Sequence, residues 1–149
     1  MKASNFELPD QDGKMHSLAG YKGRWLIVYF YPRDDTPGCT KEACSFRDAS
    51  ADFKKLGVAV VGISKDTIVS HKKFEQKHKL NFTLLADPEH KVIEAYGAWG
   101  KKKFMGREYD GTLRNTYLVN PKGEIVRTYK KVNPLTHSSQ ILQDLASLI

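Results

Sequence analysis

Short apolar runs recur along the chain and predict the strands of one sheet. Residues 26–31 and 58–63 are apolar at nearly every position, which is typical of strands that are buried on both faces between helices. Three further runs have the length of strands and turn residues at their ends. These runs cover residues 83–86, 112–119 and 124–129.

Between these runs, apolar residues recur at helical spacing. Residues 39–56 predict a helix that Gly57 ends. Further helices are predicted over residues 64–79, with a cap within 64–66, over residues 91–96, and from a start within 134–139 to the last residue. The alternation of strands and helices predicts an α/β protein with a mixed central sheet flanked by helices, as one domain over residues 1–149.

The remaining segments add a hairpin and a loop. Residues 6–8 and 14–18 flank a turn that contains Asp12-Gly13, which predicts an N-terminal β-hairpin. Residues 100–111 are basic, and we expect them to form a long loop. The resulting order of elements resembles the thioredoxin fold with an N-terminal hairpin extension.

Composition and charge exclude several classes of protein. The chain has 40% hydrophobic and 28% charged residues, and no apolar run approaches the ~20 residues of a membrane span. The net charge of +7 is dispersed, with residues 71–79 expected on the wet face of a helix, so we expect neither nucleic acid nor a membrane as partner. The first residues lack the apolar core of a signal peptide, which indicates a cytoplasmic protein whose cysteines start reduced.

Both cysteines follow the first buried run. Thr36 can cap a helix and Pro37 suits its first position, so Cys39 falls in the first turn. Free N–H groups and the positive end of the helix dipole at that place favour the thiolate and lower the pKa of a thiol. We therefore expect Cys39 to be a nucleophile.

Cys44 stands five residues further along the chain. In one unbroken helix the two Cα atoms would be about 8.5 Å apart on different faces, whereas a disulfide spans at most about 7 Å. A bond between the two cysteines therefore requires the first turns to unwind. Spacing alone also allows Cys44 to be a small buried hydrophobic residue.

The sequence predicts no metal site and no other cofactor. Two cysteines five residues apart, with scattered histidines, match no common zinc spacing. We expect each histidine to be exposed or structural. The histidines are His16, His71, His78, His90 and His137.

Two segments resemble the active site of the peroxiredoxins. The pattern Pro32-x-x-x-Thr36-x-x-Cys39 matches the signature of that family, and residues 39–44 resemble its bacterioferritin comigratory protein, or Q-type, branch. Residues 111–120, which include Arg114, resemble the segment that carries the active-site arginine. The likeness extends from about Phe6 to the C-terminus, and the one departure is Ser-Asn-Phe at residues 4–6 in place of Pro-Asp-Phe.

The resemblance implies a thiol-dependent peroxidase that reduces hydrogen peroxide and organic hydroperoxides. Cys39 would be the peroxidatic cysteine that becomes a sulfenic acid. Cys44 would be the resolving cysteine, and thioredoxin or a similar dithiol reductant would reduce the intramolecular disulfide. Thr36 and Arg114 would hold the peroxide oxygens, and Pro32 would shield the sulfenate.

The resemblance also assigns a supporting residue and an oligomeric state. Glu42, one helical turn after Cys39, would orient the active-site arginine. Spacing alone does not select Arg114 over Arg33, Arg47 or Arg107. Members of this branch are commonly monomers, so we expect a monomer.

Three other functions are open on the residues alone. A thioredoxin-like disulfide oxidoreductase without peroxidase activity shares the fold, but it uses Cys-x-x-Cys where this chain has four residues between Cys39 and Cys44. A cysteine hydrolase needs a histidine base within reach of Cys39. A basic binding module would show salt-dependent nucleic-acid affinity that does not depend on Cys39.

Overall fold

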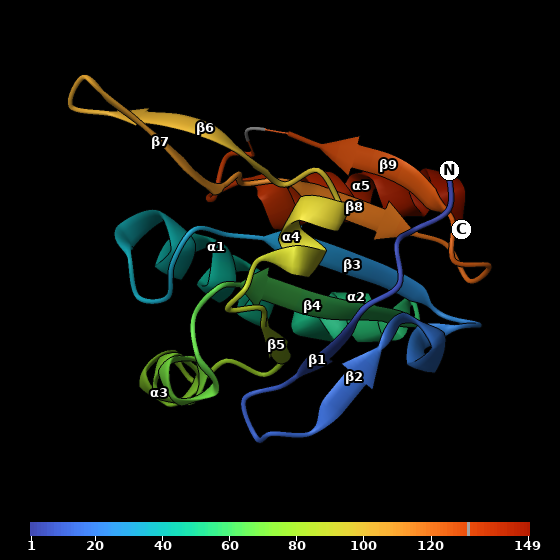
Figure 1. The fold of residues 1–149 in the computed structure, drawn as a ribbon. Coiled ribbons are helices and arrows are strands. Elements are labelled where there is room, and N and C mark those ends of the chain that lie inside the picture. The colour runs from blue at the N-terminus through green and yellow to red at the C-terminus, as the bar shows by residue number, and fades with distance from the viewer. Residues whose placement is uncertain (131) are drawn as a thin grey trace.

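A mixed five-stranded sheet forms the centre of the molecule (Figure 1). The computed structural model describes residues 1–130 and 132–149. The strands lie in the order β5-β4-β3-β8-β9; β3, β4 and β5 are parallel, and β8 is antiparallel to both of its neighbours. Their bounds are β3 Trp25–Phe30, β4 Val58–Ser64, β5 Thr83–Ala86, β8 Thr116–Val119 and β9 Ile125–Tyr129.

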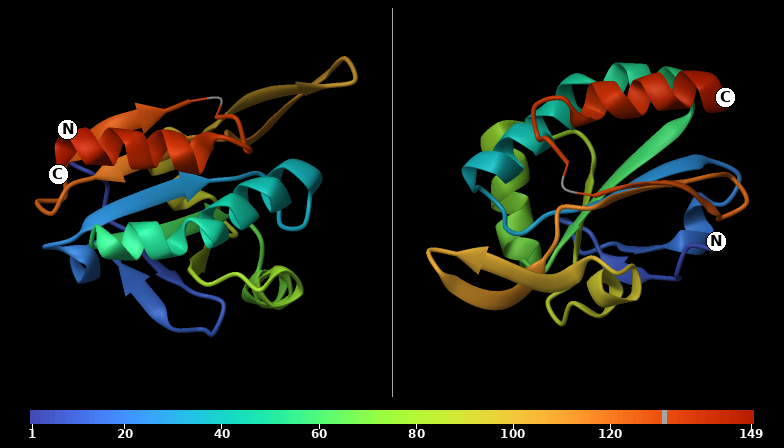
Figure 2. Two further views of the ribbon diagram at one scale, coloured as in Figure 1. Left: turned by 180° about the vertical axis from the view of Figure 1, so that it is seen from behind. Right: turned by 90° about the horizontal axis from the view of Figure 1, so that it is seen from above.

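Helices cover both faces of this sheet. Helices α1, α2 and α5 lie on one face and α4 lies on the other (Figure 2). The helical bounds are η1 Leu18–Tyr21, a 3₁₀-helix, and α1 Pro37–Asp48, α2 Ser50–Lys55, α3 Ile68–His78, α4 Lys91–Ala95 and α5 His137–Leu148. Two antiparallel hairpins complete the fold, β1 Glu7–Pro9 with β2 Met15–Ser17, and β6 Trp99–Phe104 with β7 Arg107–Thr112.

Strand β3 supplies both halves of the core. Ile27 and Tyr29 point into the cluster that contains α1, α2 and α5, whereas Leu26, Val28 and Phe30 point into the cluster around α4. Successive side chains of a strand face opposite sides of a sheet, so a strand covered on both sides is apolar throughout. The predicted thioredoxin-like arrangement, with its mixed sheet and N-terminal hairpin, is confirmed.

The loop predicted over residues 100–111 is wrong, because most of this segment belongs to the β6–β7 hairpin. Met105 and Gly106 form its turn with φ values of 52° and 79°, and two successive positive φ values are typical of the tightest hairpin turns. The hairpin projects from the body of the molecule (Figure 1), and most of its described side chains are exposed. Its strands therefore lack the apolar alternation by which a strand is predicted.

Two predicted helices have different bounds in the structure. The helix expected over residues 39–56 is divided at Ala49, whose φ and ψ of −88° and 0° leave the helical region. The division lets Phe46 of α1 and Phe53 of α2 enter the same core cluster. The helix expected from residue 64 begins at Ile68, because Thr67 caps it by accepting a hydrogen bond from the Ser70 N–H at 3.1 Å.

The strand predicted over residues 112–119 is shorter than expected. Thr112 ends β7, and only residues 116–119 join the sheet. Residues 113–115 connect the two strands in an irregular conformation, fixed by hydrogen bonds from the Leu113 N–H to the Ala98 carbonyl and from the Phe30 N–H to the Asn115 carbonyl. This short connection carries Arg114.

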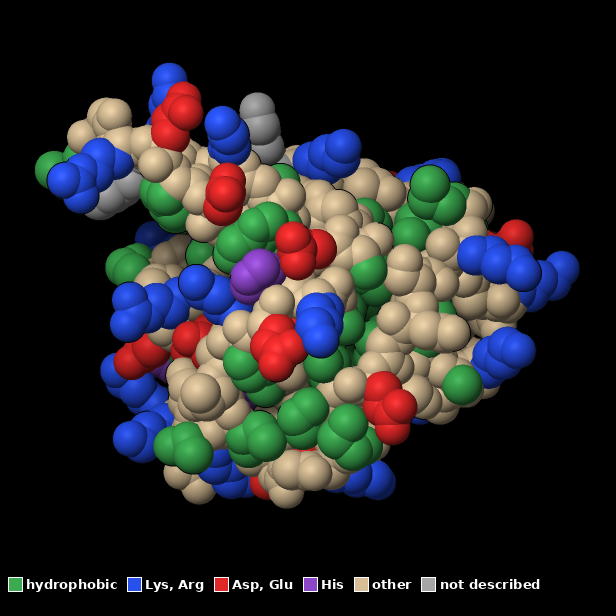
Figure 3. Space-filling model, viewed as in Figure 1, with side chains coloured by type: hydrophobic (Ala, Val, Ile, Leu, Met, Phe, Trp, Pro, Cys, Tyr) green, Lys and Arg blue, Asp and Glu red, His purple; other side chains and the backbone are tan. Residues whose placement is uncertain are grey.

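The surface charge is dispersed, as the sequence predicts. On the face shown in Figure 3, lysine and arginine side chains lie at many separate places, several of them beside acidic groups. The expectation that residues 71–79 form a wet helix face is only partly correct, because His71 and Phe74 are buried. Across the described ranges 1–130 and 132–149, no helix has both the length and the apolar composition that crossing a membrane requires.

Candidate active site

Cys39 lies in the first turn of α1, as predicted. Thr36 occupies the N-cap position and Pro37 the first position of the helix. The Thr36 hydroxyl donates to the Arg33 carbonyl at 3.0 Å rather than capping the helix, so the first-turn N–H groups stay available to an anion. The Cys39 side chain is directed into the core, with 1% of the residue exposed.

Arg114 comes from a distant part of the chain to meet this thiol. Its Nη2 donates to Cys39 Sγ at 3.3 Å across a separation of 75 residues. Gly38 leaves room for the guanidinium, because a Cβ at this position would lie 3.2 Å from Arg114 Nη2. A larger residue at position 38 would require the guanidinium to shift by a few tenths of an ångström.

Glu42 holds the other side of the same guanidinium. Its Oε1 accepts from Arg114 Nη1 at 2.8 Å, and its side chain is fully buried. The planar fork of Arg114 therefore contacts the thiol with one nitrogen and the carboxylate with the other. This geometry fits the orienting role that the resemblance implies for Glu42.

The other candidate arginines lie elsewhere. Arg47 Nη1 donates to the His78 carbonyl at 2.7 Å, and Arg33 and Arg107 are exposed. Only the fold could make this selection, because it depends on where the β7–β8 connection meets α1.

Burial and charge act against each other in this cluster. Burial raises the pKa of Glu42 from its ordinary value of 4.5 to about 7, although Arg114 opposes the shift. Burial lowers the pKa of Arg114, but the nearby Cys39 and Glu42 outweigh this effect and raise it above its ordinary value. The guanidinium therefore keeps its positive charge in a half-buried place, where its attraction for a thiolate is stronger than in water.

Lys102 is a second cation near this site, and no sequence pattern indicates it. Its Nζ donates to the Thr112 carbonyl at 3.0 Å, two residues before Arg114. Burial lowers the pKa of Lys102, and the charge of Arg114 lowers it further, whereas Cys39 raises it. The three lysines at residues 101–103 gave no signal that separates Lys102, because only strand pairing directs its side chain inward.

Cys44 faces a different part of the molecule. Both cysteines are free thiols in the same uninterrupted helix α1. Cys44 is half-buried and lines a groove of about 520 Å³ between α1 and α5, together with Leu135, Ser138 and Leu142. Helical geometry separates the two Cα atoms by about 8.5 Å, so no disulfide can form while α1 is intact.

The remaining predicted site residues lie on the connection between β3 and α1. Pro32 and Thr36 are half-buried there, at the two ends of a short loop. The structure thus brings Cys39, Arg114 and Glu42 into direct contact and places Pro32 and Thr36 on the segment that precedes the nucleophile. Cys44 is the member of the predicted set that it holds apart.

Two of the histidines are structural residues of the interior. His71 is fully buried and His137 is 1% exposed. Burial lowers the pKa of His137 to about 4, so the ring is neutral when its Nε2 meets Thr116 Oγ1 at 2.7 Å.

Comparison with known proteins identifies the relatives of this chain. Residues 1–128 match the family model described as AhpC/TSA family. The chain is 42% identical over 147 residues to peroxiredoxin Bcp of Bacillus subtilis, covering 99% of this chain and 94% of that protein. It is 44% identical over 140 residues to peroxiredoxin Bcp of Escherichia coli K12, covering 94% and 90%.

A solved structure shows the same similarity in three dimensions. The bacterioferritin comigratory protein of Xanthomonas campestris, described with its alkyl peroxide reduction activity, superposes with a TM-score of 0.90 at 32% identity. The match covers 95% of this chain and 90% of the other.

The raised pKa of Glu42 predicts a specific pH dependence of stability. Between pH 4.5 and 7 the unfolded chain releases the Glu42 proton while the folded protein retains it, so stability falls as the pH rises. Relative to Glu42→Gln, we expect the wild-type free energy of unfolding to decrease by up to about 3 kcal/mol from pH 4.5 to pH 8. Urea unfolding of both proteins across this range measures the difference.

Glu7→Gln is the matched control, because Glu7 is exposed, whereas the exposed Glu94 lies 3.1 Å from His90. The difference of Glu7→Gln from wild type should not change appreciably with pH over the same interval. A wild-type stability that rises relative to Glu42→Gln as the pH increases would contradict the assignment.

Proposed function

The chain belongs to the AhpC/TSA family and is a peroxiredoxin, a thiol-dependent peroxidase, and from this membership we propose that Cys39 is its peroxidatic cysteine. The contact between Arg114 Nη2 and Cys39 Sγ carries the proposal. A guanidinium at this distance favours the thiolate, and the thiolate is the form that attacks a peroxide.

In the first step, the Cys39 thiolate attacks one oxygen of the peroxide. A sulfur–oxygen bond forms, the O–O bond breaks, and Cys39 becomes a sulfenic acid. The leaving hydroxide or alkoxide takes up a proton to give water or an alcohol. Arg114 stabilises the developing negative charge, with Glu42 fixing its orientation.

Thr36 and Pro32 complete the proposed pocket. The Thr36 hydroxyl donates its own hydrogen to the Arg33 carbonyl, which leaves its oxygen lone pairs to accept a hydrogen bond from a bound hydroperoxide. Pro32 has no N–H to bind solvent and shields the sulfenate from water. The alkyl peroxide reduction activity described for the Xanthomonas campestris protein supports organic hydroperoxides as substrates beside hydrogen peroxide.

In the second step, Cys44 resolves the sulfenic acid. The Cys44 thiolate attacks the sulfur of Cys39, a sulfur–sulfur bond forms and the sulfur–oxygen bond breaks, and the leaving hydroxide takes up a proton to give water. The first turns of α1 must unwind before this can happen, because the intact helix separates the two cysteines. Thioredoxin or a similar dithiol then reduces the disulfide. Because both cysteines belong to one chain, the proposed cycle needs only a monomer.

Substitution of each cysteine separates the two steps. Cys39→Ser should abolish peroxide consumption, because serine supplies no thiolate. Cys44→Ser should form one equivalent of sulfenic acid per chain, detected with a sulfenic-acid trapping reagent, but should not turn over with thioredoxin and its reductase. Peroxidase activity that survives in Cys39→Ser would show that the mechanism is wrong.

Removal of the guanidinium tests the part of Arg114. Arg114→Met should lower the second-order rate constant with hydrogen peroxide by about 100-fold or more, because a preorganised charge at the reacting oxygens is lost. Arg107→Met is the matched control, since this arginine is exposed on the hairpin. It should react at the wild-type rate in stopped-flow measurements, and equal losses in the two variants would remove Arg114 from the mechanism.

The oxidised and reduced proteins should differ in the first helix. Formation of the disulfide between Cys39 and Cys44 should reduce the protection of backbone amides from hydrogen exchange between Thr36 and Phe46, because the first turns cannot stay helical. The amides of β3 provide the internal reference. Unchanged exchange over residues 36–46 in the disulfide form would contradict the unwinding.

A further inference from the structure

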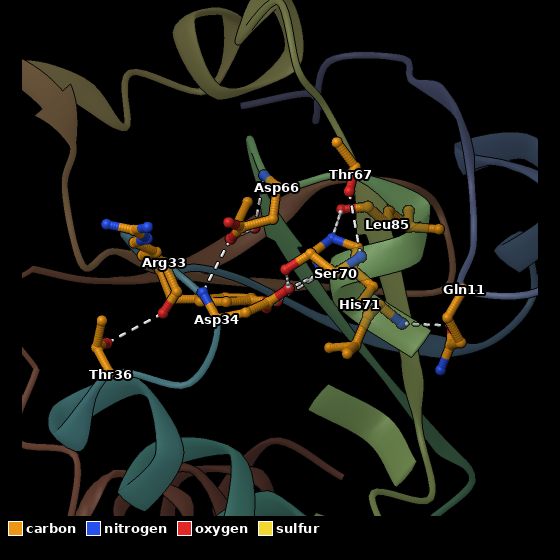
Figure 4. A network of polar contacts seen from close by, with 12 residues as sticks. Gln11, Arg33, Asp34, Thr36, Asp66, Thr67, Ser70, His71 and Leu85 are labelled. Carbon is orange, nitrogen blue, oxygen red and sulfur yellow. Dashed lines mark hydrogen bonds and ion pairs between the residues drawn. The ribbon is translucent and has the colours of Figure 1, made fainter. Parts of the chain in front are cut away.

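Asp34 lies at the centre of a buried polar network beside the proposed pocket (Figure 4). Its Oδ1 accepts from the Tyr31 hydroxyl at 2.6 Å. Its Oδ2 accepts from the Ser70 hydroxyl at 2.8 Å and meets His71 Nδ1 at 2.7 Å. One carboxylate on the β3–α1 loop thus receives hydrogen bonds from β3's end and from helix α3.

His71 is hydrogen-bonded through both nitrogens of its ring. Its Nε2 lies 2.9 Å from the Leu85 carbonyl, which can only accept, so Nε2 donates. Its Nδ1 lies 2.7 Å from Asp34 Oδ2. The contact is buried, with side-chain exposures of 0% for His71 and 4% for Asp34.

The same network also fixes the backbone of the loop. The Asp34 N–H donates to Asp66 Oδ2 at 2.9 Å, and the Ser64 hydroxyl donates to the same oxygen at 2.6 Å. Asp34, Asp66 and His71 also lie close together, and the Leu85 carbonyl and Asp34 already occupy both ring nitrogens of His71. The cluster therefore serves as an anchor for the loop.

This anchor stands between the two pocket residues of the loop. Pro32 precedes Asp34 by two residues and Thr36 follows it by two, with the Thr36 hydroxyl bonded to the Arg33 carbonyl. We propose that Asp34, through its buried contact with His71, is a positioning residue that holds Pro32 and Thr36 in the geometry used for peroxide reduction. This inference rests on the proposed function and adds a residue to the same site.

The neighbouring aspartate also contacts α3, but only at the surface. Asp35 is exposed, accepts from Lys77 Nζ at 2.7 Å and lies 3.1 Å from His78 Nε2. Exposed pairs of this kind contribute little, because water screens both charges. The chain thus supplies adjacent aspartates of which only one is buried.

The proposal separates two kinds of reactivity at Cys39. The thiolate depends on Arg114 and the start of α1, whereas alignment of a peroxide depends also on the loop. An alkylating reagent such as iodoacetamide needs the thiolate but not the peroxide pocket. Loss of the anchor should therefore slow the reaction with peroxide and leave alkylation unchanged.

The test measures both reactions in a Cys44→Ser background, where Cys39 is the single thiol. Asp34→Asn places an amide donor against groups that donate, and it should lower the second-order rate constant with hydrogen peroxide by about 10- to 100-fold, as expected for a small displacement of an aligning group. Its rate of alkylation by iodoacetamide should equal that of the parent. Asp35→Asn should match the parent in both reactions.

Two further variants keep the test decisive. Ser70→Ala removes one donor to Asp34 and should give a smaller loss in the same direction, and this variant decides the question where Asp34→Asn does not fold. Asp34→Asn combined with Thr36→Val should lose less than the product of the two separate losses, because the anchor acts in part through Thr36.

Three results would overturn the proposal. The first is a peroxide rate equal to that of the parent in both Asp34→Asn and Ser70→Ala. The second is a loss of alkylation as large as the loss of the peroxide reaction, and the third is additive effects in the double variant. These results leave the proposed function intact as long as Cys39→Ser is inactive. Peroxidase activity in Cys39→Ser would instead overturn the proposed function itself.

Discussion

The site depends on one guanidinium shared between a thiol and a buried carboxylate. Glu42 is fully buried and has a hydrogen-bond partner on only one of its oxygens among the described residues, so Arg114 is needed to compensate its charge. Arg114 in turn is held against Cys39 by this carboxylate. Three features allow the contact of Arg114 with Cys39 and Glu42. They are the position of the β7–β8 connection, the absence of a side chain at Gly38, and the helical spacing of Cys39 and Glu42. Loss of Arg114 would leave the buried Glu42 carboxylate without its partner.

Helix α1 imposes the second constraint, because its formation has opposite effects on the two proposed steps of catalysis. The folded first turn gives Cys39 its N–H groups and places it against Arg114. The same helix, when intact, directs Cys44 into the groove between α1 and α5, on another of its faces. Activation and resolution therefore need two conformations of one segment. Gly38 in the first turn is a poor helix former, which lowers the free energy of unwinding this end.

The sheet strands that the sequence predicts best are those that are buried on both faces. Strands β3 and β4 lie between two layers of helices, so their apolar runs identify them, and the turn residues identify the N-terminal hairpin. The β6–β7 hairpin projects from the body and has no buried face to mark it. Arg114 could not be selected by spacing, because its contact with Cys39 arises from the antiparallel pairing of β8 with β3, which the local sequence does not encode. The family signature supplied what local patterns lacked.

The buried network around Asp34 shows why polar residues of the interior are the hardest to predict. The sequence of α3 has a thin apolar stripe, and its charged residues indicate a wet face. The helix packs against the core through Phe74 and is held by the contacts of His71 and Ser70 with Asp34. Hydrophobic periodicity does not predict these contacts. A helix held in this way is sensitive to the exact position of its partner, because a displaced contact leaves buried polar groups poorly compensated. The loop before α1 is thereby held in place by α3. A fixed pocket loop therefore precedes the helix that must unwind.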